Sequence, residues 1–235
     1  MPIEWASAFG AFVYRTIGSR MAVDSVARSN LMHAFPKKSA AEINLIVRGM
    51  WDNLGRGAGE YAHLNGIDIT ENNSRVEVVG REILEMLRDD GQPGIIVGGH
   101  LGNWECATLV ATQLGLPLAS IYRGAANPWL NRLFHKVRKG LVDEVLFKGR
   151  EGAHRALAIL RGGGHLGVMV DQKLNTGIAI PFFGRLAMTA PMPAQLALRL
   201  KCPLVPARFE RLPGVRFRVT FFKPLTLPDS DDNKA

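Results

Sequence analysis

Hydrophobic and polar positions change their period near residue 75 of this chain. Before that point, apolar residues recur at helical spacing and predict three helices, at about 3–17, 23–34 and 39–63. Ser39 and Glu42 stand at the spacing of a capping box at the start of the third helix. The glycine-rich run 55–59 within that helix favours close packing against another helix.

After residue 75, short apolar runs alternate with segments of helical spacing. Strands are expected at about 76–79, 94–99, 118–122, 144–147 and 166–170, and helices at about 81–88, 103–114, 127–140 and 152–160. Such alternation is typical of a largely parallel sheet covered by helices on both faces. Runs at 178–182, 203–209 and 215–222 are expected to add antiparallel strands. The predicted fold is α/β, with a mostly parallel central sheet flanked by helices and an N-terminal helical extension.

Three parts are expected along the 235 residues: an N-terminal helical segment (1–70), an α/β core (71–228) and a polar tail (229–235). A hydrophobic content of 47% with 21% charged residues fits one globular core of ordinary size.

Two interpretations of the first helix remain open. Trp5, Phe9 and Phe12 lie along one side, which would either pack into a core or lie in a membrane interface. Arg15 and Arg20 would face lipid head groups in the second case. The apolar N-terminal run is shorter than the ~20 residues that a membrane-spanning helix needs.

The net charge of +8 favours an anionic partner such as membrane phosphate or an acidic carrier protein. Nucleic acid is the weaker choice, because no run of five or more Lys or Arg occurs and aromatic residues are not interleaved with basic ones. Cys106 and Cys202 have apolar neighbours and no metal-ligand spacing, so both are expected in the core in a reducing compartment. No metal site is predicted.

The stretch 94–109, GIIVGGHLGNWECATL, carries the clearest chemistry. It predicts a strand ending at two glycines, His100 in a loop, Asn103 as the N-cap of a helix, and Glu105 in the first helical turn. Across the intervening turn, the Glu105 carboxylate is expected to reach the His100 imidazole. A carboxylate on one ring nitrogen fixes the tautomer and makes the other nitrogen a general base.

A simpler interpretation stays open for this pair, in which His100 caps a turn and Glu105 begins a helix. Their place at the carboxyl end of a buried strand favours function, because ligand crevices form there in α/β sheets. Residues 162–167 match G-x-G-x-x-G, but this run follows a helix and precedes a strand, so it is interpreted as a helix end. No G-x-S-x-G nucleophile motif occurs.

Several segments together resemble the lysophospholipid acyltransferase superfamily, and most closely its branch of lipid A biosynthesis acyltransferases. HLGNWE resembles the His-x4-Glu/Asp block of that family. Five further blocks follow its order: NLMHAFP (30–36), YRGAANPWL (122–130), VMVDQK (168–173), IPFFGRLAMTAP (180–191) and PLVPARFER (203–211).

The resemblance implies an O-acyltransferase that moves a fatty acyl chain from a thioester to a hydroxyl of a lipid A precursor, without a covalent acyl-enzyme. The donor would be acyl-carrier protein or acyl-CoA, so no cofactor is expected. Partners would be acyl-carrier protein, a phosphorylated glycolipid acceptor and the membrane surface. The expected location is the cytoplasmic face of the bacterial inner membrane, as a peripheral or monotopic protein.

The resemblance also extends the candidate site beyond His100 and Glu105. Arg123, Asn127, Arg138 and Asp171 match the family's other functional blocks and would bind substrate or stabilise the oxyanion. Arg123 would hold a phosphate of acceptor or carrier, and Asp171 would hold Arg138 in place. Each of the four has a simpler alternative as a surface ion-pair residue or, for Asn127, a helix cap.

Other functions stay open on the sequence. An acyltransferase for phosphatidylinositol mannosides or another glycolipid would carry similar blocks. A non-catalytic lipid- or carrier-binding homologue would keep the fold, although the His100–Glu105 pair speaks against it. A hydrolase is the third alternative, because water can replace the acceptor in an open site.

Overall fold

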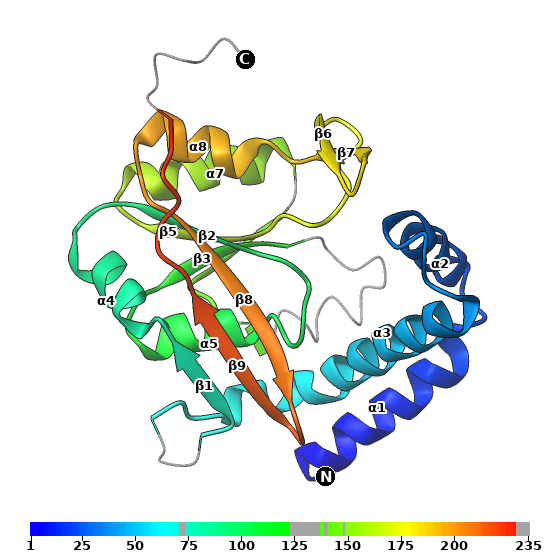
Figure 1. Cartoon of the computed structure of the whole chain (residues 1–235). Coiled ribbons are helices and arrows are strands. Elements are labelled where there is room, and N and C mark those ends of the chain that lie inside the picture. The colour runs from blue at the N-terminus through cyan, green and yellow to red at the C-terminus, as the bar shows by residue number, and fades with distance from the viewer. Residues whose placement is uncertain (71–73, 123–136, 139–140, 148, 229–235) are drawn as a thin grey trace. The chain divides into compact units, whose positions relative to one another are not determined.

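The structure is a computed structural model, and it describes residues 1–70, 74–122, 137–138, 141–147 and 149–228 (Figure 1). The chain divides into two compact units. Unit 1 comprises Met1–His63 and Ala179–Ala187, and unit 2 comprises Leu64–Ile178 and Met188–Ala235. The expected tail 229–235 and most of the expected helix 127–140 lie outside the described residues.

The three N-terminal helices of unit 1 are confirmed as α1 (Ile3–Gly18), α2 (Ala22–Ala34) and α3 (Ala40–Glu60). The capping box at the start of α3 is also confirmed: the Glu42 N–H donates to Ser39 Oγ at 3.3 Å, and the Ser39 N–H donates to Glu42 Oε2 at 2.8 Å. The α-helix ends three residues earlier than expected, because the chain tightens into a 3₁₀ helix, η1 (Tyr61–Gly66).

The glycines of α1 and α3 let the two helices pack closely, as the glycine-rich run predicted. A Cβ atom on Gly55 would lie 2.3 Å from the Gly10 carbonyl oxygen. One turn further along, the buried Ser7 hydroxyl donates to Glu60 Oε1 at 2.7 Å. The apolar side of α1 is not the side packed here, since the side chains of Trp5, Phe9 and Phe12 are exposed.

Unit 2 is built on a seven-stranded sheet with the order β1-β9-β8-β2-β5-β3-β4. Its strands are β1 (Val76–Val79), β2 (Gly94–Gly98), β3 (Leu118–Tyr122), β4 (Glu144–Phe147), β5 (His165–Met169), β8 (Leu204–Leu212) and β9 (Arg216–Phe221). Strands β8, β2, β5, β3 and β4 run parallel to one another, whereas β9 is antiparallel to β8 and parallel to β1. The predicted mostly parallel α/β sheet is therefore confirmed.

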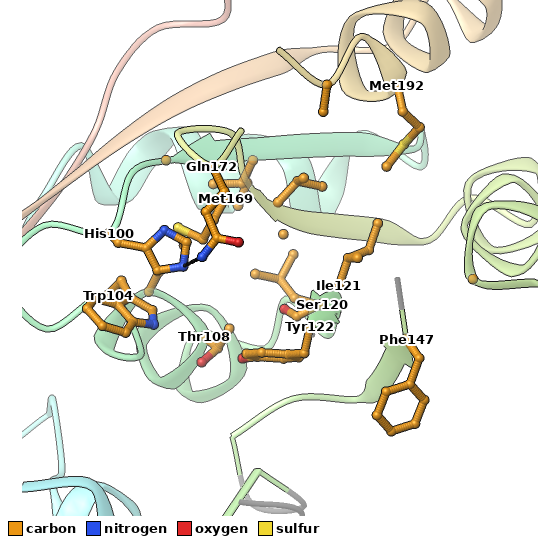
Figure 2. A pocket seen from close by; sticks show the side chains of 18 of the residues that line it. His100, Trp104, Thr108, Ser120, Ile121, Tyr122, Phe147, Met169, Gln172 and Met192 are labelled. Atoms are coloured by element: carbon orange, nitrogen blue, oxygen red, sulfur yellow. Dashed lines mark hydrogen bonds between the residues drawn. The ribbon is translucent and has the colours of Figure 1, made fainter. Parts of the chain in front are cut away.

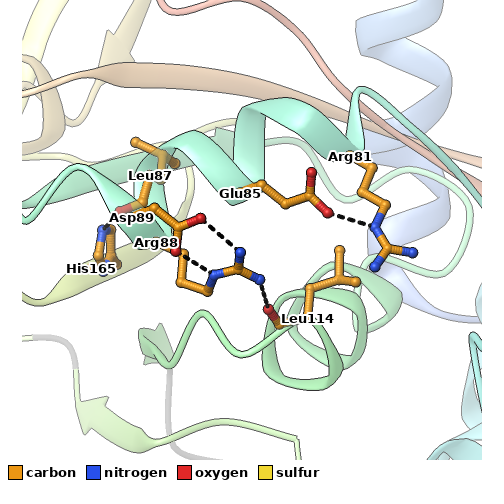
Figure 3. Close-up of polar contacts among 7 residues, drawn as sticks. All are labelled: Arg81, Glu85, Leu87, Arg88, Asp89, Leu114 and His165. Atoms are coloured by element: carbon orange, nitrogen blue, oxygen red, sulfur yellow. Dashed lines mark hydrogen bonds and ion pairs between the residues drawn. The ribbon is translucent and has the colours of Figure 1, made fainter.

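Helices cover both faces of this sheet (Figure 1). On one face, α7 (Arg150–Arg161) and α8 (Met192–Leu200) pack on an apolar core. On the other lie α4 (Arg81–Asp89) and α5 (Cys106–Gln113). The Arg88 guanidinium at the end of α4 donates to the Leu114 carbonyl at 2.9 Å, and His165 Nε2–H donates to the Leu87 carbonyl at 2.9 Å (Figure 3). Cys106 and Cys202 are buried, as expected.

Three details differ from the sequence-based expectations. Strand β6 (Ile178–Phe182) pairs with β7 (Arg185–Thr189) in a separate two-stranded sheet, because the turn between them, with positive φ at Phe183 and Gly184, folds β7 directly back on β6. Strand β8 is parallel to its neighbour β2, so β9 alone adds an antiparallel pairing at this place in the sheet. Helix α5 begins at Cys106, three residues after the expected N-cap Asn103, because residues 104–105 form a turn before the helix and Glu105 is the N-cap.

Within the described part of the chain, no helix has both the length and the apolar character needed to cross a lipid bilayer.

Candidate active site

The candidate site lies where two neighbouring parallel strands end. In the register of β2 and β5, Gly98 is opposite Met169, and the Val170 N–H continues the ladder by donating to the Gly98 carbonyl at 3.0 Å. His100 and Asp171 each follow two residues after this last pair. Parallel strands present their carboxyl ends at one sheet edge, so the two side chains meet there.

The His100 imidazole is oriented by Asp171. Nδ1 lies 2.6 Å from Asp171 Oδ1, and the His100 backbone N–H donates to Asp171 Oδ2 at 2.7 Å. Because a carboxylate can only accept, Nδ1 carries the proton and Nε2 keeps its lone pair. Burial raises the pKa of the Asp171 carboxyl, but the hydrogen bonds from His100 outweigh burial and the net pKa lies below its ordinary 3.8. Asp171 is therefore ionised at neutral pH.

The expected contact between Glu105 and His100 is wrong, because Glu105 has other partners. The Glu105 side chain is only 4% exposed, and its carboxylate accepts from Tyr122 Oη at 3.0 Å and from Arg138 Nη2 at 3.3 Å. The late start of α5 places Glu105 at the N-cap rather than in the first helical turn. There it meets two donors, one of which is at the carboxyl end of β3.

The expected partner of Arg138 is corrected in the same way. Glu105, not Asp171, holds its guanidinium, whose Cζ also lies 3.6 Å from the centre of the Tyr122 ring. An ion pair and a cation–π contact thus fix a side chain that is only 13% exposed. The two expected partners are therefore exchanged: Asp171 holds His100, and Glu105 holds Arg138.

Two side chains next to His100 were not predicted as site residues. Gln172 places its side-chain Nε2 3.3 Å from His100 Nε2 (Figure 2). The Trp104 ring meets the His100 ring edge-on, with 4.9 Å between ring centres. Gln172 follows Asp171 in the sequence and Trp104 precedes Glu105. This adjacency to predicted site residues was the sequence feature that could have indicated them.

His100 lines a pocket of about 550 Å³ that is formed within unit 2 (Figure 2). Much of its wall is apolar, including Ile96, Ala107, Leu118, Ile121, Val168 and Met192. Polar groups on the wall include the hydroxyls of Thr108 and Ser120 and the Arg138 guanidinium. A concave, largely apolar space with a few convergent polar groups is typical of a small-molecule or lipid-chain site.

Two predicted site residues, Arg123 and Asn127, lie outside the described residues. Among the residues that are described, no three His, Cys, Asp or Glu side chains come together as a metal site would require. The groups that the structure does bring together are a partly exposed imidazole with an ionised carboxylate behind it, an amide beside it and an apolar pocket. This arrangement can remove a proton from a hydroxyl bound next to His100 Nε2.

Comparison with known proteins agrees with the resemblance of the sequence blocks. No curated protein matches this chain. The family model described as bacterial lipid A biosynthesis acyltransferase matches residues 1–235, which is the whole chain. The protein therefore belongs to the bacterial lipid A biosynthesis acyltransferase family.

Proposed function

We propose that this protein transfers a fatty acyl group from acyl-carrier protein or acyl-CoA to a hydroxyl of a phosphorylated glycolipid precursor of lipid A. The observation that carries the proposal is the hydrogen bond between Asp171 and His100, a residue on the wall of an apolar pocket, in a chain of this family. The pair supplies a base for the acceptor hydroxyl, and the pocket supplies an apolar environment for the acyl chain.

In the proposed reaction, His100 Nε2 takes the proton of the acceptor hydroxyl as the oxygen attacks the thioester carbonyl carbon. Asp171 stabilises the imidazolium that forms. The carbon–sulfur bond then breaks, and His100 returns the proton to the sulfur, leaving an ester and a free thiol. No acyl-enzyme is formed. General-base catalysis of this kind contributes typically about 10²–10⁴-fold in rate.

The acyl chain is proposed to lie in the pocket of unit 2. Each methylene group moved from water to an apolar wall contributes about 0.8 kcal/mol, so a long chain would gain much of its binding free energy here. Arg138 presents a positive charge to the same pocket, held by Glu105 and Tyr122. With Arg123 and Asn127, it is proposed to bind the polar part of a substrate.

The protein is proposed to act at the cytoplasmic face of the bacterial inner membrane as a peripheral or monotopic protein. In unit 1, Trp5, Phe9 and Phe12 on α1 and Phe182 and Phe183 on the β6–β7 hairpin are all exposed. Aromatic side chains suit the interface of a bilayer, and the net charge of +8 suits anionic head groups.

Sedimentation with anionic phospholipid vesicles tests the membrane proposal. A Trp5→Ser/Phe9→Ser variant is expected to leave more protein in the supernatant than the wild type. A Met86→Ser variant is the control, because Met86 is an exposed apolar residue of α4 in unit 2. Equal binding by all three proteins would contradict the proposed role of α1.

Thiol release is the test of the proposed reaction. It is measured from acyl-carrier protein and from acyl-CoA thioesters, with and without a phosphorylated disaccharide lipid, for wild type and His100→Ala. Acceptor-dependent release that His100→Ala abolishes would support the transferase. Release at the same rate with and without the acceptor would indicate a hydrolase instead. No release from either donor would favour a non-catalytic binding protein.

A further inference from the structure

The Gln172 side chain is hydrogen-bonded to His100 Nε2, the ring nitrogen that acts as the base in the proposed reaction. In the neutral imidazole of His100, Nδ1–H donates to Asp171, so Nε2 can only accept. The amide nitrogen of Gln172 lies 3.3 Å from this Nε2, and its N–H therefore donates to the lone pair (Figure 2). Gln172 is also part of the pocket wall.

An acceptor hydroxyl must displace this amide before it can give its proton to Nε2. The backbone of Gln172 stays close to His100, because the carboxylate of the neighbouring Asp171 is bonded to both the backbone and the ring of His100. The attacking oxygen will take the position near Nε2 that the amide leaves. The carbonyl oxygen of the thioester is then only two bonds from the attacking oxygen, within the reach of the displaced side chain.

We propose that Gln172 is a catalytic residue that donates to His100 Nε2 in the free enzyme and to the thioester carbonyl oxygen during transfer. The inference rests on the proposed function. The hydroxyl proton goes to Nε2 while the oxygen–carbon bond forms, and the electron pair of the carbonyl moves onto its oxygen. The Gln172 N–H stabilises that negative charge. When the carbonyl re-forms, the carbon–sulfur bond breaks and the proton passes from Nε2 to the sulfur.

The resting contact between Gln172 and His100 can be tested without any substrate. A nuclear Overhauser effect is expected between the side-chain amide protons of Gln172 and the ring protons of His100, with Gln172→Leu and His100→Ala assigning the two signals. Adding the acceptor lipid is expected to weaken it, because the hydroxyl replaces the amide. An absent effect in the wild type would overturn the contact and with it the proposal.

Steady-state thiol release with acceptor tests the catalytic role. Gln172→Leu keeps similar bulk but has no donor, and it is expected to lower kcat by about 10²–10³-fold with little change in KM, as loss of one oxyanion donor does. Gln172→Glu should fall at least as far, because a carboxylate at neutral pH cannot donate to a developing oxyanion. Gln195→Leu, at an exposed glutamine of α8, is the matched control and should keep the wild-type kcat.

The possible failures are distinct. If wild type shows acceptor-dependent release that His100→Ala abolishes, while Gln172→Leu keeps a kcat within about threefold of wild type, only the role of Gln172 is overturned. A rise in KM at unchanged kcat would likewise overturn it, because the contact would then serve uniform binding rather than the transition state. If the wild type releases no thiol with acceptor, the proposed function fails, and the catalytic role of Gln172 fails with it.

Discussion

Replacing Glu105 by Gln would remove the negative charge from a deeply buried ion pair. Gln keeps the shape of the side chain and an oxygen that can still accept from Tyr122 Oη, which lies 3.0 Å from Glu105 Oε2. What changes is the charge opposite Arg138. The Glu105 and Arg138 side chains are only 4% and 13% exposed, so water cannot easily replace the lost carboxylate.

The expected cost is large for one substitution. Removing one partner of a buried ion pair typically costs about 3–5 kcal/mol, because the remaining charge stays buried and loses the opposite charge that offset its desolvation. Total unfolding free energies are about 5–15 kcal/mol. For a chain of this size, 1 kcal/mol corresponds to roughly 2–4 °C, so the expected fall in Tm is about 6–20 °C.

Urea and thermal unfolding of the purified variant measure this effect. Glu144→Gln is the matched control: Glu144 pairs with Arg155, but their side chains are 34% and 56% exposed, and a surface pair contributes about 0–1 kcal/mol. Adding Arg138→Met to Glu105→Gln is expected to recover much of the loss, because no charge then remains buried. A cost for Glu105→Gln no greater than that for Glu144→Gln would refute the reasoning.

Two further predictions concern stability. Burial lowers the pKa of His165 from its ordinary 6.5, so its contribution to the unfolding free energy is present above about pH 6.5 and is lost as pH falls, when the unfolded chain alone binds the proton. The difference in unfolding free energy between wild type and His165→Asn should therefore shrink between about pH 7 and pH 5. A difference that stays constant over this range would contradict the prediction. Gly55→Ala should destabilise the protein by about 1–3 kcal/mol, because the new Cβ would meet the Gly10 carbonyl. Gly49→Ala in the same helix is the control, because its new Cβ has nothing within 4 Å, and it should be neutral or stabilising by up to about 1 kcal/mol. Equal denaturation midpoints for the two variants would rule out the close packing of α1 and α3.

The change of hydrophobic period was enough to predict most elements of the fold. The run 94–98 is apolar and flanked by glycines, and it forms β2 with Ile95 and Ile96 buried. The capping box at Ser39 fixed the start of α3, because both of its hydrogen bonds are local in sequence. Such features need only neighbouring residues, which is why the sequence alone could indicate them.

The partners of the two carboxylates depended on information that the local sequence lacks. Both His100 and Asp171 could be placed at strand ends, but only the strand order puts β2 beside β5 and makes the two meet. Glu105 was the nearer carboxylate along the chain and therefore the expected partner. Gln172 lies in the VMVDQK block, but only its neighbour Asp171 was selected there, and the contact of Gln172 with His100 follows from the same strand pairing.

The separate β6–β7 hairpin was missed for another reason. Alternating or apolar runs predict that a segment is extended, but not which strand it pairs with. Every residue of β6 is exposed, so no buried face distinguishes it from an edge strand of the main sheet. The tight turn at Phe183 and Gly184 decides the pairing, and Phe183 is an unusual residue for positive φ.

The most direct test of the account is the kcat for acceptor-dependent thiol release by Asp171→Asn. The neutral amide of this variant cannot stabilise an imidazolium as a carboxylate does, so kcat is expected to fall by about 10²–10⁴-fold. Asp143→Asn, at an exposed aspartate before β4, should keep the wild-type rate. A kcat for Asp171→Asn within about threefold of wild type would contradict the proposed role of Asp171 as the partner of a general base, His100.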